Sequence, residues 1–77
     1  MPVRADEVLD VRGKSCPFPV LMTRDQLRKM KGGEILEVVE NYPQSKDNIR
    51  RFAEKHGHKV LSVIKEKAYY RIFIRRK

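Results

Sequence analysis

The chain has 77 residues, of which 40% are apolar and 36% charged, with one cysteine and a formal net charge of +8. This length suffices for one domain, residues 1–77, and so small a domain buries only about 60% of the surface that its unfolded chain exposes. It therefore excludes a deep enclosed substrate cavity, and the single cysteine excludes an internal disulfide.

The first part of the chain predicts a strand, a turn and a helix. Val8 to Arg12 is rich in β-forming residues, and Gly13-Lys14-Ser15 provides a turn. A helix follows from about Pro17, because proline suits the first helical position, and continues to Lys31. Gly32-Gly33 then ends it, since glycine adopts the left-handed conformation at little cost.

The middle of the chain predicts a second strand and a second helix. Ile35 to Glu40 forms the strand, and Asn41-Tyr42-Pro43 breaks it. The helix starts near Ser45 or Asp47 and ends at Gly57. Its apolar stripe has helical spacing. The stripe consists of Ile49, Phe52, Ala53 and His56, unless His56 instead caps the helix end.

The last part predicts a hairpin of two strands, Val60 to Ile64 and Tyr69 to Arg75. The element order is therefore βαβαββ, and right-handed crossovers place both helices on one face of a sheet. We expect an α/β two-layer sandwich whose other sheet face is open. Alternation places four side chains on that open face. They are Tyr69, Arg71, Phe73 and Arg75.

Cys16 is the candidate chemical centre because it lies at the predicted N-cap of the first helix. Helix N-termini carry partial positive charge, and Arg12 and Lys14 add more. Such a setting lowers the pKa of a thiol and favours an anion on the sulfur. Pro17 and Pro19 stiffen the helix start. The alternative is a buried cysteine that only packs.

Phe18 and Met22, four residues apart on the first helix, form a second feature. They either present an exposed docking spot one turn from the sulfur or pack against the second helix. His56 and His58 with one cysteine do not match a structural zinc site, so we expect no metal ion and no cofactor. The basic charge fits an acidic partner protein or nucleic acid, or only keeps the domain dissolved.

The residues around Cys16 resemble the Cys-Pro-x-Pro signature of the TusA/SirA family. The similarity begins with Leu9-Asp10 and Gly13 and includes Cys16-Pro17-Phe18-Pro19-Val20. It extends along nearly the whole chain in the same element order. The further matching positions are Arg24, Leu27, Met30, Gly33-Glu34, Leu36, Pro43, Ile49, Phe52 and Gly57-His58.

This resemblance implies a mixed four-stranded sheet and a sulfur carrier. Cys16 would accept persulfide sulfur from a cysteine desulfurase or rhodanese-like donor, with Gly13, Pro17 and Pro19 supporting the motif. It would pass the sulfur to an acceptor protein in tRNA thiolation, molybdenum cofactor synthesis or other sulfur metabolism. Partners would dock on the residues around the sulfur. These are Arg12, Lys14, Phe18, Met22 and Arg24.

Location and competing functions follow from the same features. No apolar run approaches the roughly 20 residues that span a bilayer, and Met1 to Glu7 contains no apolar signal region, so we expect a cytoplasmic protein. We expect a monomer, because a carrier must expose its site and the sequence shows no convincing oligomer interface. One alternative function is a small basic RNA-binding module that uses the open sheet face as a stacking platform. Another is a regulatory or scaffold protein with an unreactive cysteine.

Overall fold

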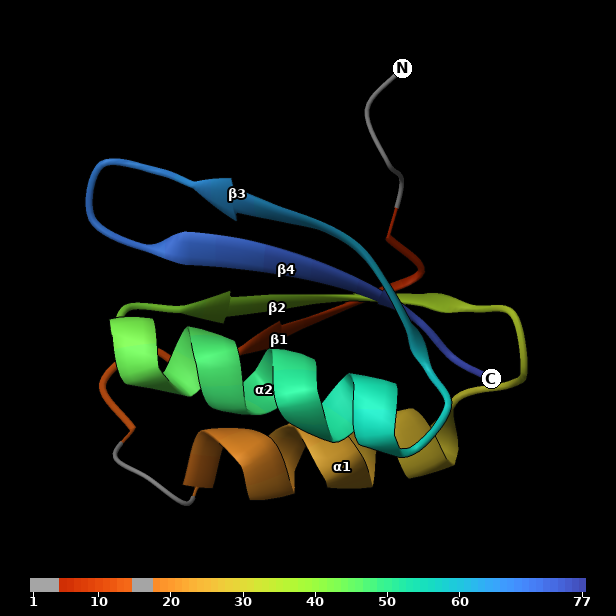
Figure 1. The fold of residues 1–77 in the computed structure, drawn as a ribbon. Helices are drawn as coiled ribbons and strands as arrows, with labels where there is room; N and C mark the ends of the chain where they lie inside the picture. The colour runs from red at the N-terminus through yellow and green to blue at the C-terminus, as the bar shows by residue number, and fades with distance from the viewer. Residues whose placement is uncertain (1–4, 15–17) are drawn as a thin grey trace.

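The computed structural model describes residues 5–14 and 18–77. Their elements follow the order βαβαββ (Figure 1), which confirms the predicted order. The strands are β1 (Glu7–Asp10), β2 (Ile35–Glu40), β3 (Lys59–Lys65) and β4 (Tyr70–Arg75). The helices are α1 (Phe18–Lys29) and α2 (Pro43–Lys55).

The four strands form one mixed sheet in the order β1-β2-β4-β3. β1 pairs in parallel with β2, so that Leu9 lies opposite Val38, whereas β4 is antiparallel to both of its neighbours. A register shift between Val60 and Ser62 interrupts the pairing of β3 with β4. Because β1 and β2 are parallel, their carboxyl ends meet at one edge of the sheet, and β4 begins at that same edge.

Both helices cover the same face of the sheet (Figure 1), which confirms the two-layer sandwich. Leu36 and Val38 on β2, and Ile72 and Ile74 on β4, have no exposed surface. Burying such a side chain contributes about 1.5–3 kcal/mol relative to leaving it exposed. The other buried members of this core are Val11, Leu27, Met30, Ile49 and Ala53.

The second helix begins earlier than the sequence predicted. Pro43 is its first residue and Tyr42 is its N-cap, with extended backbone angles of φ −113° and ψ 127°. Ser45 lies inside the helix and is buried, so the prediction of a start at Ser45 or Asp47 was wrong. Pro43 does not only break the strand. Its missing N–H needs no partner in a first helical turn, so it also starts the helix.

The other end of α2 decides between the two expectations for His56. This residue is the C-cap, and its backbone N–H donates to the Phe52 carbonyl at 3.1 Å. His56 is exposed, and its ring packs in a tilted arrangement against Phe52 with 4.4 Å between ring centroids. His56 therefore caps the helix instead of joining the buried stripe. Gly57, at φ +83°, then turns the chain toward β3, as predicted for a helix end.

The uncovered face of the sheet differs from the expected stacking platform. Phe73 is on this face, but only 2% of its surface is exposed. The Arg71 guanidinium lies 5.3 Å from the ring centroid, and Glu37 holds that guanidinium at 3.0 Å. Tyr69 is half-buried beneath the Arg12 guanidinium at 5.4 Å. The predicted exposure of Phe73 was wrong because an ion pair between β2 and β4 holds an arginine over the ring.

Candidate functional site

The predicted chemical centre, Cys16, lies outside the described residues together with Ser15 and Pro17. Its predicted position as N-cap, and that of Pro17 as first helical residue, stay predictions. The structure describes the chain on both sides, up to Lys14 and from Phe18 onward. The geometry of these flanking segments fixes where the motif enters and leaves the fold.

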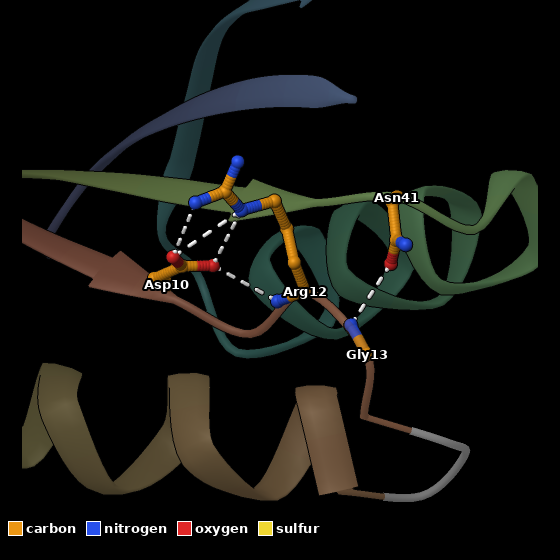
Figure 2. A network of polar contacts seen from close by, with 4 residues as sticks. All are labelled: Asp10, Arg12, Gly13 and Asn41. Carbon is orange, nitrogen blue, oxygen red and sulfur yellow. Dashed lines mark hydrogen bonds and ion pairs between the residues drawn. The ribbon is translucent and has the colours of Figure 1, made fainter. Parts of the chain in front are cut away.

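The loop after β1 is tied to the loop after β2. The Gly13 backbone N–H donates to Asn41 Oδ1 at 3.1 Å (Figure 2). Gly13 lies within a turn in which the Lys14 N–H donates to the Val11 carbonyl at 3.2 Å. Gly13 has φ +79°, which glycine adopts far more easily than other residues. The predicted turn at Gly13 is confirmed, and the side chain that anchors it, Asn41, was not foreseen.

Arg12 was expected to add positive charge near Cys16, but its guanidinium forms an ion pair with Asp10. Its Nε and Nη2 donate to the Asp10 carboxylate at 3.0 and 2.8 Å (Figure 2). The same carboxylate accepts the backbone N–H of Arg12 at 3.0 Å. Hydrogen bonds from Arg12 lower the pKa of Asp10 and raise the pKa of Arg12 itself. Arg12 therefore shapes the loop, and exposed Lys14 is left as the loop cation without an ion pair among the described residues.

The start of α1 separates the two residues expected to form a docking pair. Phe18 is 55% exposed, whereas Met22 is partly buried and packs against the core. Pro19 is buried, and its carbonyl accepts the hydroxyl of fully buried Thr23 at 2.8 Å. Phe18 and Met22 therefore do not form one exposed pair, and docking at Phe18 stays a prediction. Phe18, the third residue of the motif, is the exposed large apolar residue nearest to Cys16 in sequence among the residues described.

Arg24, also expected at the docking surface, lies further along α1. Its guanidinium contacts Asp25 at 3.1 Å, and both side chains are substantially exposed. Such an exposed pair contributes at most about 1 kcal/mol. Arg24 also lines a cavity toward the carboxyl end of the helix, together with Arg28. The structure therefore places Arg24 apart from the Gly13 loop.

Glu40, the last residue of β2, is a buried acidic residue that was not predicted from the sequence. Only 1% of its surface is exposed, and its Oε2 accepts the Tyr42 N–H at 2.7 Å. Its Oε1 is buried and has no hydrogen-bond partner within the described part of the chain. Burial raises the pKa of Glu40, and the Tyr42 hydrogen bond and the charge of Lys46 oppose that rise. Glu40 lies two residues after Val38 and four after Leu36, so strand alternation places all three on the same, covered face of the sheet. This alternation could have indicated the burial of Glu40.

Residues 5–14 and 18–77 contain neither a grouped set of metal ligands nor a membrane-spanning helix. No group of three or more His, Cys, Asp or Glu side chains in these ranges is placed to hold a metal ion. Within the same ranges, no helix has the length and apolar character to cross a membrane.

The comparison with solved structures supports the fold. A SirA-like protein from Desulfitobacterium hafniense superposes with a TM-score of 0.81 at 22% sequence identity. The match covers 90% of this chain and 95% of that one. It shows that the two chains share the two-layer fold.

The comparison with known sequences gives the family. The profile described as Sulfurtransferase TusA matches residues 7–76. A Methanocaldococcus jannaschii protein, named as a proposed sulfur carrier, is 42% identical over 96% of this chain and 99% of its own length. The Escherichia coli protein YedF, named likewise, is 45% identical over 75% of both chains. With the family profile matching from β1 to the end of β4, the chain belongs to the TusA/SirA family.

Proposed function

We propose that this chain is a sulfur carrier that holds sulfur as a persulfide on Cys16. The observation that carries the proposal is the family match over residues 7–76, which includes the only cysteine of the sequence. The relatives named above as proposed sulfur carriers support the same role. A lone cysteine suits a reducing compartment such as the cytoplasm, where a thiol stays free.

The proposed transfer needs no oxidant or cofactor. The Cys16 thiolate attacks the terminal sulfur of a donor persulfide, and the donor S–S bond breaks as the new S–S bond forms. The donor cysteine leaves as a thiolate, so one sulfur atom moves without net oxidation. A nucleophile of the acceptor then attacks that sulfur, and Cys16 leaves as a thiolate.

The residues on either side of Cys16 support an anionic sulfur. The first turn of α1 contains no acidic residue, and Lys14 is exposed two positions before the cysteine. A helix N-terminus stabilises a nearby negative charge, and such a setting lowers the pKa of a thiol. In this proposal Gly13 sets the turn, and Pro17 and Pro19 stiffen the helix start.

The donor in this proposal is a cysteine desulfurase or a rhodanese-like protein, and the acceptor is a second protein. The acceptor would serve tRNA thiolation, molybdenum cofactor synthesis or other sulfur metabolism. A net charge of +8 speeds encounter with acidic partner surfaces. A monomer keeps the cysteine accessible to both partners.

Intact-mass measurement tests the carrier role. The protein is incubated with a cysteine desulfurase and cysteine, and in parallel with a rhodanese charged with thiosulfate. We expect the wild type to gain one sulfur that dithiothreitol releases, and Cys16→Ser to gain none. Sulfur on Cys16→Ser, or no added sulfur on the wild type with either donor, would contradict the proposal.

A matched pair of exposed apolar residues tests the docking surface. Phe18 is 55% exposed within the motif, and Val8 is 62% exposed on β1. Truncation of an interface residue that anchors binding costs more than about 1.4 kcal/mol, which is tenfold in affinity. We expect Phe18→Ala to slow sulfur uptake about tenfold at low donor concentration, and Val8→Ala to leave it unchanged. Equal rates for the two variants would remove Phe18 from the docking surface.

A further inference from the structure

A basic cavity lies at the end of the helical layer opposite to the motif. Its volume is about 120 Å³, and its polar lining comes from α1 and from the segments after α2 and β4. These lining residues are Arg24, Arg28, His56, His58 and Arg76. Arg28 is ten residues beyond the start of α1, which corresponds to about 15 Å along the helix axis. The cavity is therefore separate from the loop that carries Cys16.

The positive charge around this cavity is not neutralised by its lining. Three guanidinium groups and two imidazoles line it, and no described carboxylate does. Arg24 and Arg28 are four residues apart on one helix face, where like charges destabilise one another. Within the described residues, Arg28 forms no ion pair and Arg24 has only its exposed contact with Asp25. An anion in the cavity would relieve this repulsion.

Arg76 is held in place by two main-chain oxygens. Its Nε donates to the Leu27 carbonyl at 2.5 Å, and its Nη1 donates to the Lys77 main-chain oxygen at 3.3 Å. These contacts orient the guanidinium beside the cavity before any ligand arrives. A guanidinium held this way loses little freedom on binding and suits the paired oxygens of an oxyanion.

His58 supplies a neutral donor to the same place. Its Nδ1 accepts the Lys77 backbone N–H at 3.0 Å, which leaves the proton of the neutral ring on Nε2. Burial lowers the pKa of His58, and the charges of Arg76, His56 and Lys77 lower it further. The contribution of these three charges to the lowered pKa of His58 agrees with a locally positive potential.

Compensation of helix dipoles explains only part of the positive charge around the cavity. Cations near a helix carboxyl end offset its partial negative charge, and Arg28 lies in the last turn of α1. Arg24, however, is five residues before that end, which is more than one turn. Arg76 and His58 belong to neither helix.

We propose that this cavity binds a small tetrahedral oxyanion of the sulfate or phosphate class. The volume equals that of about four waters at about 30 Å³ each, which suits a single oxyanion group. Leu27 and Phe52 provide the apolar part of the lining. The oxyanion is either a free ion or the phosphate of a nucleotide, and separate probes distinguish these sources. The site is independent of the proposed sulfur transfer at Cys16.

Nuclear magnetic resonance titration of the full chain tests the site. Sodium sulfate, sodium phosphate and adenosine monophosphate are each compared with sodium chloride at equal ionic strength. We expect saturable shifts of the His58 ring and of the backbone near Arg76 with at least one of the three oxyanions. Saturation by the free ions supports a free-ion site, and saturation by the nucleotide alone supports a site for its phosphate.

Two variants on adjacent positions make the test specific. Arg28→Gln removes a cation that lines the cavity, and Lys29→Gln removes one that is exposed beside it without lining it. We expect about tenfold weaker oxyanion binding for Arg28→Gln, because a charge-assisted hydrogen bond is lost. Lys29→Gln should bind as the wild type does. Shifts that match those in chloride, or equal weakening by the two variants, would overturn the proposal.

Discussion

Ionisation of Glu40 should destabilise the fold, and Glu40→Gln tests this. The carboxyl is 1% exposed, and one of its oxygens lacks a partner among the described residues. A buried polar atom without a partner costs about 1–3 kcal/mol, and a charged one costs more. The variant keeps an oxygen for the Tyr42 N–H and removes the negative charge. It replaces the unpartnered oxygen with an amide nitrogen, so we expect only part of that cost to be regained, about 1 kcal/mol.

The pH dependence follows from the raised pKa of Glu40, whose ordinary value is 4.5. Between that value and its raised value in the fold, the folded state holds more protons than the unfolded state. Stability from the neutral carboxyl is therefore fully present below pH 4.5 and is lost as the pH rises through the folded pKa. The advantage of Glu40→Gln should accordingly be largest at neutral pH and vanish in acid.

Thermal unfolding followed by circular dichroism from pH 4 to pH 8 measures this difference. About 1 kcal/mol corresponds to about 4–8 °C in Tm for a domain of this size. Glu54→Gln is the control, because Glu54 is an exposed glutamate whose contact with Arg50 is 3.4 Å long. Its Tm should change little, since exposed pairs contribute at most about 1 kcal/mol. A Glu40→Gln curve parallel to or below the wild-type curve throughout this range would refute the reasoning.

Three further substitutions test the packing around the sheet and the motif by urea unfolding. Phe73→Ala should lower the free energy of unfolding by about 3–5 kcal/mol, because Phe73 is only 2% exposed. A loss below about 1 kcal/mol would mean that the ring is not packed. Gly13→Ala should cost about 1–2 kcal/mol of stability through its φ of +79° alone, since nothing lies within 4 Å of an added Cβ. An unchanged midpoint of urea unfolding would contradict that backbone conformation. Thr23→Val should cost about 1 kcal/mol by removing the donor to the Pro19 carbonyl, and a gain in stability would argue against that hydrogen bond.

Residue patterns predicted the element order and the two layers, and the family resemblance supplied the mixed sheet. Alternation assigned residues 69, 71, 73 and 75 to the open face, and the intervening Ile72 and Ile74 do lie in the core. Helical spacing grouped Ile49 and Ala53 in one apolar stripe, and both are buried. These signals work because burial on one face is a property of each element and can be read locally. The start of α2 was misplaced because Pro43 both ends an extended segment and begins a helix, and the sequence alone does not rank these two effects.

Contacts between distant segments were not predictable in the same way. The pairing of Asn41 with Gly13 joins two loops that are 28 residues apart, and no local pattern indicates it. The burial of Phe73 depends on a partner for Arg71 from β2, which is 34 residues away. The cancellation of the Arg12 charge by Asp10 was closer in sequence and could have been inferred from two opposite charges two residues apart.

The strand order has a consequence for the growing chain during synthesis. β4 comes last in the sequence but pairs on one side with β2 and on the other with β3. Until residues 70–75 have left the ribosome, β2 has an unpaired side and β3 has no strand to pair with. Such unpaired strands invite pairing with other chains. Cooperative folding of this protein therefore waits for its final strand, and a chain truncated before Tyr70 should aggregate.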